Sequence, residues 1–86
     1  MRFFVDANVF LRHFTQDQQK QAAQAEALFE GARRGGWELL CGPPVLFEVA
    51  WTLRRGFGLK RETVQDMLES VLAMEGLTVQ DGSVIR

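Results

Sequence analysis

Two short apolar runs, each followed by a helical pattern, constrain the fold of this chain more than any other feature. The first run is Phe3 to Val5, and the second lies in WELLCGPP, residues 37–44. Short, continuous apolar runs of this kind are typical of buried strands in a parallel sheet. Glycine and two prolines stop the second run, and Pro43 and Pro44 are acceptable only at the opening of a following helix.

Helical patterns fill the rest of the chain. Residues 9–14 suggest a short helix, and from Asp17 the apolar residues recur on one helical face until Ala32, before two arginines and two glycines end the pattern. The segment Val45 to Arg55 is apolar on almost every side, which predicts a buried helix. ETVQDMLESVLAM, residues 62–74, predicts an amphipathic surface helix, and Leu77 to Gln80 alternates like a third strand.

This order predicts an α/β fold, a small parallel sheet flanked by helices, with the sequence β-α-α-β-α-α-β. The 86 residues are enough for one small domain, 1–86, and their 47 % hydrophobic and 24 % charged content is that of a soluble globular protein. In parallel sheets, ligands bind beyond the carboxyl ends of the strands. Asp6 follows the first strand directly, so it lies where such a site is expected.

Composition excludes several classes of protein. A formal net charge of −1 argues against a broad electrostatic grip on nucleic acid, so any phosphate contact must be local. The cations concentrate at Arg54, Arg55, Lys60 and Arg61, which are either solvated residues at a helix end or a phosphate-facing patch. With one cysteine, no signal peptide pattern and no membrane segment, we expect a cytoplasmic location. Cys41 and His13 are both interpreted as structural.

A second carboxylate, Glu48, stands inside the apolar stretch PPVLFEVAWTL. A buried carboxylate needs a cation or several donors, so Asp6 and Glu48 together predict a site for Mg²⁺ or Mn²⁺. Each residue also has a structural alternative. Asp6 is a good N-cap for the segment from Ala7, and Glu48 could accept backbone hydrogen bonds or pair with Arg54 or Arg55.

FVDANVFLR, followed by helix and then PPVLFEVAWTLRRGFGLKRETVQDMLESVLAMEGLTV, resembles the N-terminal two thirds of a PIN domain. The resemblance is closest to the bacterial PIN ribonucleases that act as VapC-type toxins in toxin–antitoxin pairs, and it runs along essentially all of the chain. It implies that Asp6 is the first catalytic aspartate and metal ligand, that Asn8 helps to orient it, and that Glu48 is the second acidic residue.

The chain departs from the family pattern at two places. Ala7 stands where family members often have a hydroxyl residue. Members also carry one or two further aspartates after the third strand, and Asp81 comes too early to be assigned to either position. Asp81, Gly82 and Ser83 read as a turn and an N-cap, with few residues after them, so we expect a partial domain without the C-terminal elements.

The resemblance implies metal-assisted hydrolysis of RNA phosphodiesters, with Arg54 and Arg55 contacting the RNA backbone. Because two acidic groups are fewer than the family uses, we expect the isolated chain to be inactive unless another chain completes the site. The alternative is a non-catalytic remnant that binds a partner, such as an antitoxin peptide in an apolar groove near Phe10, Leu46 and Trp51. A homodimer is also expected, because an incomplete sheet leaves apolar surface uncovered.

Overall fold

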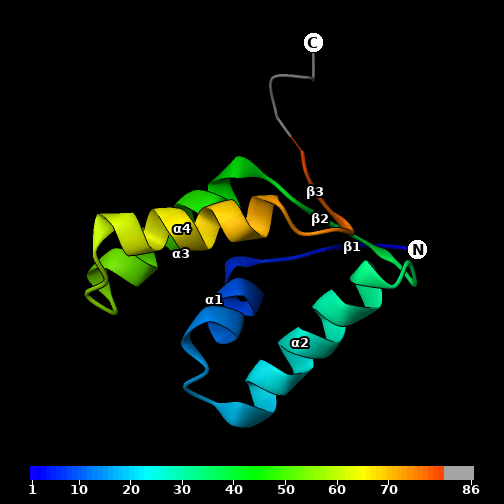
Figure 1. Ribbon diagram of the computed structural model, residues 1–86, viewed down its shortest axis with the longest axis horizontal. Helices are drawn as coiled ribbons and strands as arrows, with labels where there is room; N and C mark the ends of the chain where they lie inside the picture. The colour runs from blue at the N-terminus through cyan, green and yellow to red at the C-terminus, as the bar shows by residue number, and fades with distance from the viewer. Residues whose placement is uncertain (81–86) are drawn as a thin grey trace.

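The computed structural model describes residues 1–80, and within them the chain forms a three-stranded parallel sheet and four helices. The elements follow one another as β1 (Arg2–Phe4), α1 (Ala7–Thr15), α2 (Gln19–Arg33), β2 (Glu38–Cys41), α3 (Pro43–Arg55), α4 (Arg61–Leu72) and β3 (Leu77–Val79) (Figure 1). The α/β class and the predicted order of elements are therefore confirmed. The predicted turn at Asp81 to Ser83 lies outside the described residues.

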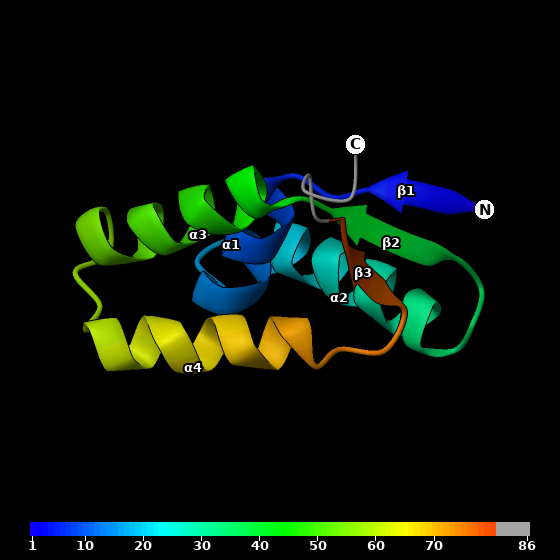
Figure 2. The same cartoon turned by 90° about the horizontal axis from the view of Figure 1, so that it is seen from above.

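The sheet has the strand order β1-β2-β3, and both pairs are parallel. In register, Phe3 lies beside Leu39 and Leu39 beside Leu77, so these three side chains share one face. α2 covers this face, which Figure 2 shows with α2 behind the strands. Trp37 connects the two layers, because its indole Nε1–H donates to the carbonyl of Leu28 in α2 at 3.0 Å and its ring meets Phe3 edge to face.

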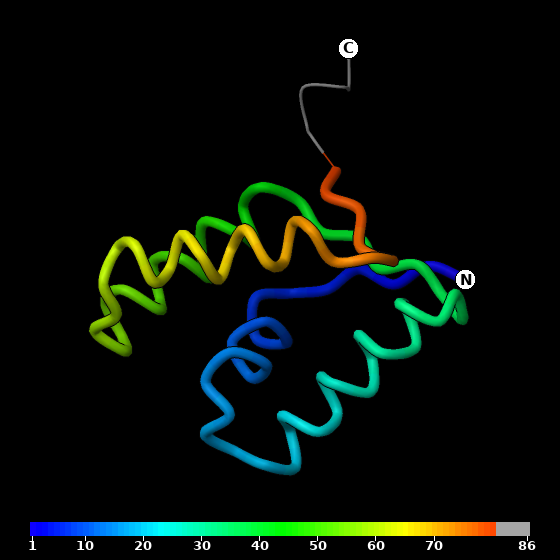
Figure 3. The backbone as a smooth tube through the Cα atoms, in the orientation of Figure 1, coloured from blue at the N-terminus to red at the C-terminus, as the bar shows by residue number. Residues whose placement is uncertain are grey.

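The chain enters α1 and α3 from the same edge of the sheet. β1 runs into α1 and β2 runs into α3, as the tube in Figure 3 shows. α1 and α3 pack against one another, and α3 in turn packs against α4. Parallel neighbouring strands make this inevitable, because their carboxyl ends meet at one edge and their following helices start side by side.

The core forms where α1, α2 and α3 meet the sheet. Phe10 and Phe29 are fully buried and stack with ring centroids 5.6 Å apart, while Leu39, Val49 and Leu53 are also fully enclosed. Each side chain of this size contributes about 1.5–3 kcal/mol when it leaves water. His13 packs on Phe29 and contacts Glu26 of α2, so it joins the two helices and its interpretation as structural is confirmed.

The prediction that Phe3 to Val5 form a buried strand is confirmed for Val5, which is buried just after β1, and is wrong for β1 itself. All three of its residues are exposed, and Phe4 shows 76 % of its surface to solvent. The reason is position, since β1 is an edge strand that pairs only with β2 among residues 1–80. Side chains alternate along a strand, so Phe4 points away from the face that α2 covers.

The prediction that α3 is buried all round is also wrong. Only Val49 and Leu53 are fully buried, whereas Phe47 and Trp51 are 74 % and 65 % exposed. Within the described residues, α1 and α4 cover one side of the helix and leave the other to solvent. None of the helices in residues 1–80 has the length and apolar character needed to cross a membrane.

Gly76 provides a test of how tightly the chain turns into β3. Its φ is +85°, and a Cβ there would stand 2.5 Å from the carbonyl oxygen of Ala32. Gly58 is the matched control, because its φ is +68° but nothing lies within 4 Å of its would-be Cβ. We expect Gly58→Ala to lower the free energy of unfolding by about 1 kcal/mol through backbone strain alone. Gly76→Ala should lower it by at least about 2 kcal/mol, because the clash adds to that strain.

Urea unfolding followed by circular dichroism measures both variants. Equal losses for Gly58→Ala and Gly76→Ala would contradict the close packing of α2 against the turn before β3.

Candidate functional site

Asp6 lies at the junction of β1 and α1 and acts as the N-cap of α1. Its backbone is extended, with φ −89° and ψ 175°, and its Oδ1 accepts a hydrogen bond from the backbone N–H of Val9 at 3.3 Å. The structural alternative for Asp6 is therefore formed. Because the side chain is exposed and a carboxylate has further lone pairs, capping leaves Oδ2 able to bind a cation. Asn8, also exposed, follows in the first turn of α1.

Glu48 lies in the second turn of α3 on its solvent side. The argument that burial forces a cation onto this carboxylate is therefore wrong, because water can solvate Glu48. The ion pairs formed among residues 1–80 do not include Glu48, Arg54 or Arg55, so the predicted alternative of a pair between them is not formed either. Glu48 thus presents a carboxylate without a cationic partner among the described residues.

Asp6 and Glu48 belong to neighbouring elements at one edge of the sheet. Asp6 stands after β1, and Glu48 stands one turn into the helix that begins directly after β2. The two strands are parallel neighbours, and α1 packs on α3. The fold thus brings the segments that carry Asp6, Asn8 and Glu48 to one edge, and the convergence of the two carboxylates on one ion stays a prediction.

The available ligands set a limit on what this edge can bind. Mg²⁺ is commonly held by one or two carboxylates together with waters and substrate phosphates, and Asp6 and Glu48 fit that description. Within residues 1–80, no three side chains of the types His, Cys, Asp and Glu gather into a metal-binding group. A site built from this part of the chain therefore offers a divalent ion little protein charge, and the ion would be held weakly.

Further along α3, an exposed indole lies beside two guanidinium groups. Ala50, Trp51, Arg54 and Arg55 line an open pocket of about 410 Å³. Arg55 Cζ lies 5.9 Å from the centroid of the Trp51 ring, at the outer limit of a cation–π contact. Sequence reasoning placed Trp51 among the apolar residues of a buried helix and missed it as a member of a charged surface. In the sequence, the signal for this surface is the pair Arg54 and Arg55, which follows Trp51 by one helical turn.

A second concave surface lies between α3 and α4. This groove has a volume of about 380 Å³, and its floor is apolar, with Val64 and Leu68 below and Leu72 56 % exposed at one end. Arg54 and Arg61 supply cations to the groove, and Glu69 supplies a carboxylate. Phe10, which was expected beside a peptide groove, is fully buried against Phe29 of α2 and cannot line an open groove.

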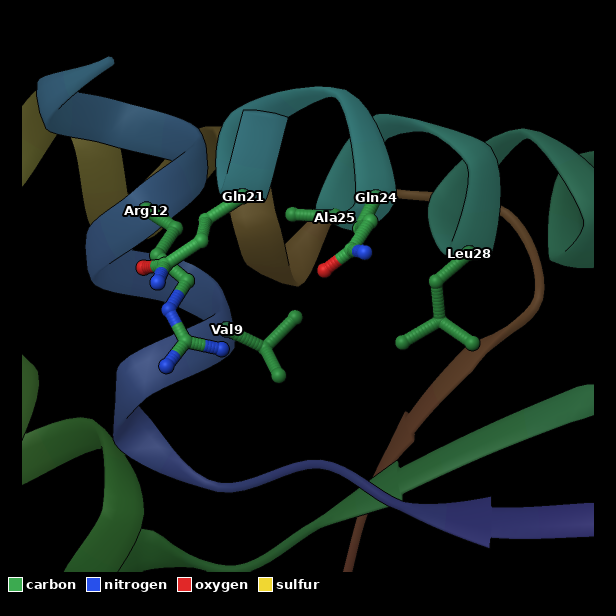
Figure 4. A pocket seen from close by; sticks show the side chains of 6 residues that line it. All are labelled: Val9, Arg12, Gln21, Gln24, Ala25 and Leu28. Carbon is green, nitrogen blue, oxygen red and sulfur yellow. The ribbon is translucent and has the colours of Figure 1, made fainter. Parts of the chain in front are cut away.

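A third pocket, of about 230 Å³, lies between α1 and α2 (Figure 4). Val9 and Leu28 give it an apolar side, and the polar ends of Arg12, Gln21 and Gln24 reach over its other side. It has one cation, two neutral amides and no carboxylate, thiol or imidazole in its lining. The chemistry of this pocket suits neither metal binding nor nucleophilic catalysis, so the carboxyl edge of the sheet remains the better candidate site.

Comparisons with known proteins give no relative: no family model, no curated protein and no solved structure matches this chain. The candidate site therefore rests on the geometry of residues 1–80 and on the resemblance in the sequence.

Cys41 is excluded as a nucleophile by its surroundings. It ends β2 with 1 % of its surface exposed, and burial raises the pKa of its thiol above the ordinary value. The thiolate is the reactive form of cysteine, so the folded protein should not react with a disulfide reagent such as Ellman's reagent at about pH 8, whereas the unfolded chain should react fully.

The raised pKa of Cys41 also fixes the sign of a pH effect on stability. Above about pH 8.5 the thiol of the unfolded chain loses its proton while the buried thiol of the folded chain keeps it. The free energy of unfolding should therefore fall as the pH rises through this range, and Cys41→Ala should flatten that fall.

In the labelling experiment, reaction of native Cys41 with Ellman's reagent at the rate of the unfolded chain would contradict its buried position.

Proposed function

We propose that this chain is a metal-dependent endoribonuclease of the PIN type, similar to VapC toxins, and that its described residues form part of the active site. The support is the arrangement of two solvated carboxylates on elements that leave the same edge of a parallel sheet, where such folds bind ligands. Since two carboxylates hold a divalent ion weakly, further acidic groups would come from a partner chain or from residues outside the described part.

Each residue has a distinct role in this proposal. Asp6 binds the ion through the oxygen that does not cap α1, and Asn8 orients Asp6. Glu48 binds the ion or takes a proton from the attacking water. Arg54 and Arg55 hold the phosphate backbone of RNA, because guanidinium groups bind phosphate in a bidentate way. A bound Mg²⁺ or Mn²⁺ would supply an acidified water and stabilise negative charge on the phosphate oxygens.

The metal proposal is tested by removing both charges while keeping the helix cap. Asparagine caps helices as well as aspartate does, so Asp6→Asn preserves the cap, and Glu48→Gln keeps the shape of an exposed side chain. We expect Mn²⁺ titration by calorimetry to give millimolar affinity at best for the wild-type chain, and no measurable binding for the double variant. The isolated chain should cleave a single-stranded RNA slowly or not at all.

The melting temperature of the metal-free protein provides a control. If the two carboxylates are close, they repel one another without a cation, and the double variant should melt at a higher temperature than the wild type. A lower melting temperature would favour purely structural roles for Asp6 and Glu48. Micromolar Mn²⁺ affinity of the wild-type chain would contradict the two-ligand site and require a further ligand.

We further propose that the chain forms a homodimer through the edge of β1. The outer edge of β1 pairs with no strand among residues 1–80, and Phe4 beside it is 76 % exposed. An open strand edge with an apolar side chain is a ready surface for a second copy, and two copies related by a twofold axis would cover it mutually.

Sedimentation velocity at tens of micromolar tests this dimer. The wild-type chain should sediment as a dimer, and Phe4→Ser should shift it to the monomer because the substitution removes the apolar side chain from the interface. Phe57→Ser is the matched control, since Phe57 is 46 % exposed but lies in the turn between α3 and α4. A wild-type monomer, or an equal effect of both substitutions, would contradict an interface at β1.

A second candidate function is binding of a partner protein, such as an antitoxin, and the groove between α3 and α4 favours it. Its apolar floor, exposed Leu72 and two arginines suit a helical peptide with an apolar stripe and acidic residues. The double variant Asp6→Asn with Glu48→Gln separates the two candidates, because neither residue lines this groove. A groove partner would bind the variant unchanged, whereas Mn²⁺ binding would be lost.

A further inference from the structure

One face of α3 carries three chemically different groups in a row. Glu48, Trp51 and Arg55 are spaced three and four residues apart, so they lie on the same side of the helix. All three are exposed. With a rise of about 1.5 Å per residue, Glu48 and Arg55 stand about 10 Å apart along the helix axis. The exposed indole therefore lies between the carboxylate near the sheet and the guanidinium at the far end.

Trp51 is a large aromatic surface left open to water. Its side chain is 65 % exposed, and the pocket beside it is lined by Ala50, Arg54 and Arg55 without a carboxylate. The ion pairs among residues 1–80 leave both arginines out, although Glu30 of α2 pairs with Arg33 and Arg34. Two guanidinium groups and a flat indole thus remain available together. Their natural ligand is a planar group joined to an anion.

We propose that this pocket binds one nucleotide of a single-stranded nucleic acid, with the base stacked on Trp51 and the adjoining phosphate held by Arg54 and Arg55. Stacking on an exposed aromatic side chain and phosphate contacts from arginine are the two general means by which proteins hold single strands. The pocket volume of about 410 Å³ lies in the range of small-ligand sites. An acidic peptide would satisfy the arginines but would make no use of the open indole face.

This inference rests on the proposed function for its direction along α3. A strand held at Trp51 and Arg55 would extend toward Glu48 on the same helical face, and the next phosphate would approach the carboxyl edge of the sheet. The pocket at Trp51 would then position the substrate rather than take part in the chemistry. Binding at this pocket needs no metal, so it is measured separately from catalysis.

The experiment uses fluorescein-labelled octauridylate and follows its anisotropy with the full chain in EDTA, where no cleavage occurs. Trp51→Ala should weaken binding at least about fivefold, because the base can no longer stack, and Trp51→Phe should restore most of the affinity. The double change Arg54→Gln with Arg55→Gln should weaken binding and reduce the slope of log affinity against log salt by about 0.7 for each phosphate that the arginines no longer neutralise.

Matched controls come from other elements. Phe57→Ala removes an exposed aromatic ring that does not line the pocket, and Arg33→Gln with Arg34→Gln removes the same charge from α2. Both should leave the affinity for octauridylate within twofold of wild type. Because Trp51 lies outside the core, circular dichroism should give the same melting curve for its variants as for the wild type within a few degrees.

Several results would overturn the proposal. The first is unchanged binding by Trp51→Ala, and the second is an equal loss in Phe57→Ala. The third is displacement of the probe by an oligoglutamate peptide as readily as by unlabelled octauridylate, which would assign the pocket to acidic peptides. Glu48→Gln separates the two proposals, since it should keep octauridylate binding in EDTA. Normal probe binding together with Mn²⁺ binding that the double variant Asp6→Asn with Glu48→Gln retains would sink the nuclease proposal and leave the nucleotide pocket standing.

Discussion

The parallel pairing of β1 with β2 is the constraint on which the rest of the structure depends. Phe3 lies beside Leu39 and Phe4 beside Leu40, and the N–H of Val5 extends the ladder by donating to the carbonyl of Leu40 at 2.8 Å. A parallel pair cannot be closed by a tight turn, so the chain must cross over, and α1 and α2 form that crossover. The packing of this crossover on Leu39 builds the core. Because the two strands are parallel, α1 and α3 leave the sheet from the same edge. An antiparallel pair would separate Asp6 from Glu48 by the length of the sheet.

The same pairing explains why Phe4 is exposed although it lies in the sheet. α2 covers the face that carries Phe3 and Leu39, and no helix in residues 1–80 covers the face that carries Phe4. On α3, likewise, Val49 and Leu53 face the neighbouring helices while Phe47 and Trp51 face solvent. Phe4, Phe47 and Trp51 are therefore exposed because no neighbouring element among residues 1–80 packs over them.

The sequence predicted the elements well because their signals are local. Asp6 before Ala7, glycines after Arg34 and prolines at the start of α3 are stop and start signals that act within a few residues. The burial of β1 and of α3 was predicted wrongly because burial depends on neighbours that the local pattern does not contain. Phe3 to Val5 is as apolar as Leu39 to Cys41, yet β2 is central and β1 is at the edge.

The error about α3 changes the meaning of Glu48. If the helix were enclosed, the carboxylate would require a cation to offset its desolvation, and the residue alone would indicate a metal. On a solvated face that requirement disappears, and what remains informative is the position of Glu48 relative to other groups.

On the same face of α3, Glu48 is followed by the indole of Trp51 and then by the guanidinium of Arg55, within a chain whose net charge is only −1. All three groups are exposed and neither charge joins an ion pair among the described residues, so they remain accessible to a ligand. A single strand with alternating bases and phosphates matches this order, and its phosphate nearest the sheet would need a cation to approach Glu48. In the proposed function, the nucleotide pocket and the metal site would therefore depend on one another for catalysis, although each would bind its ligand alone.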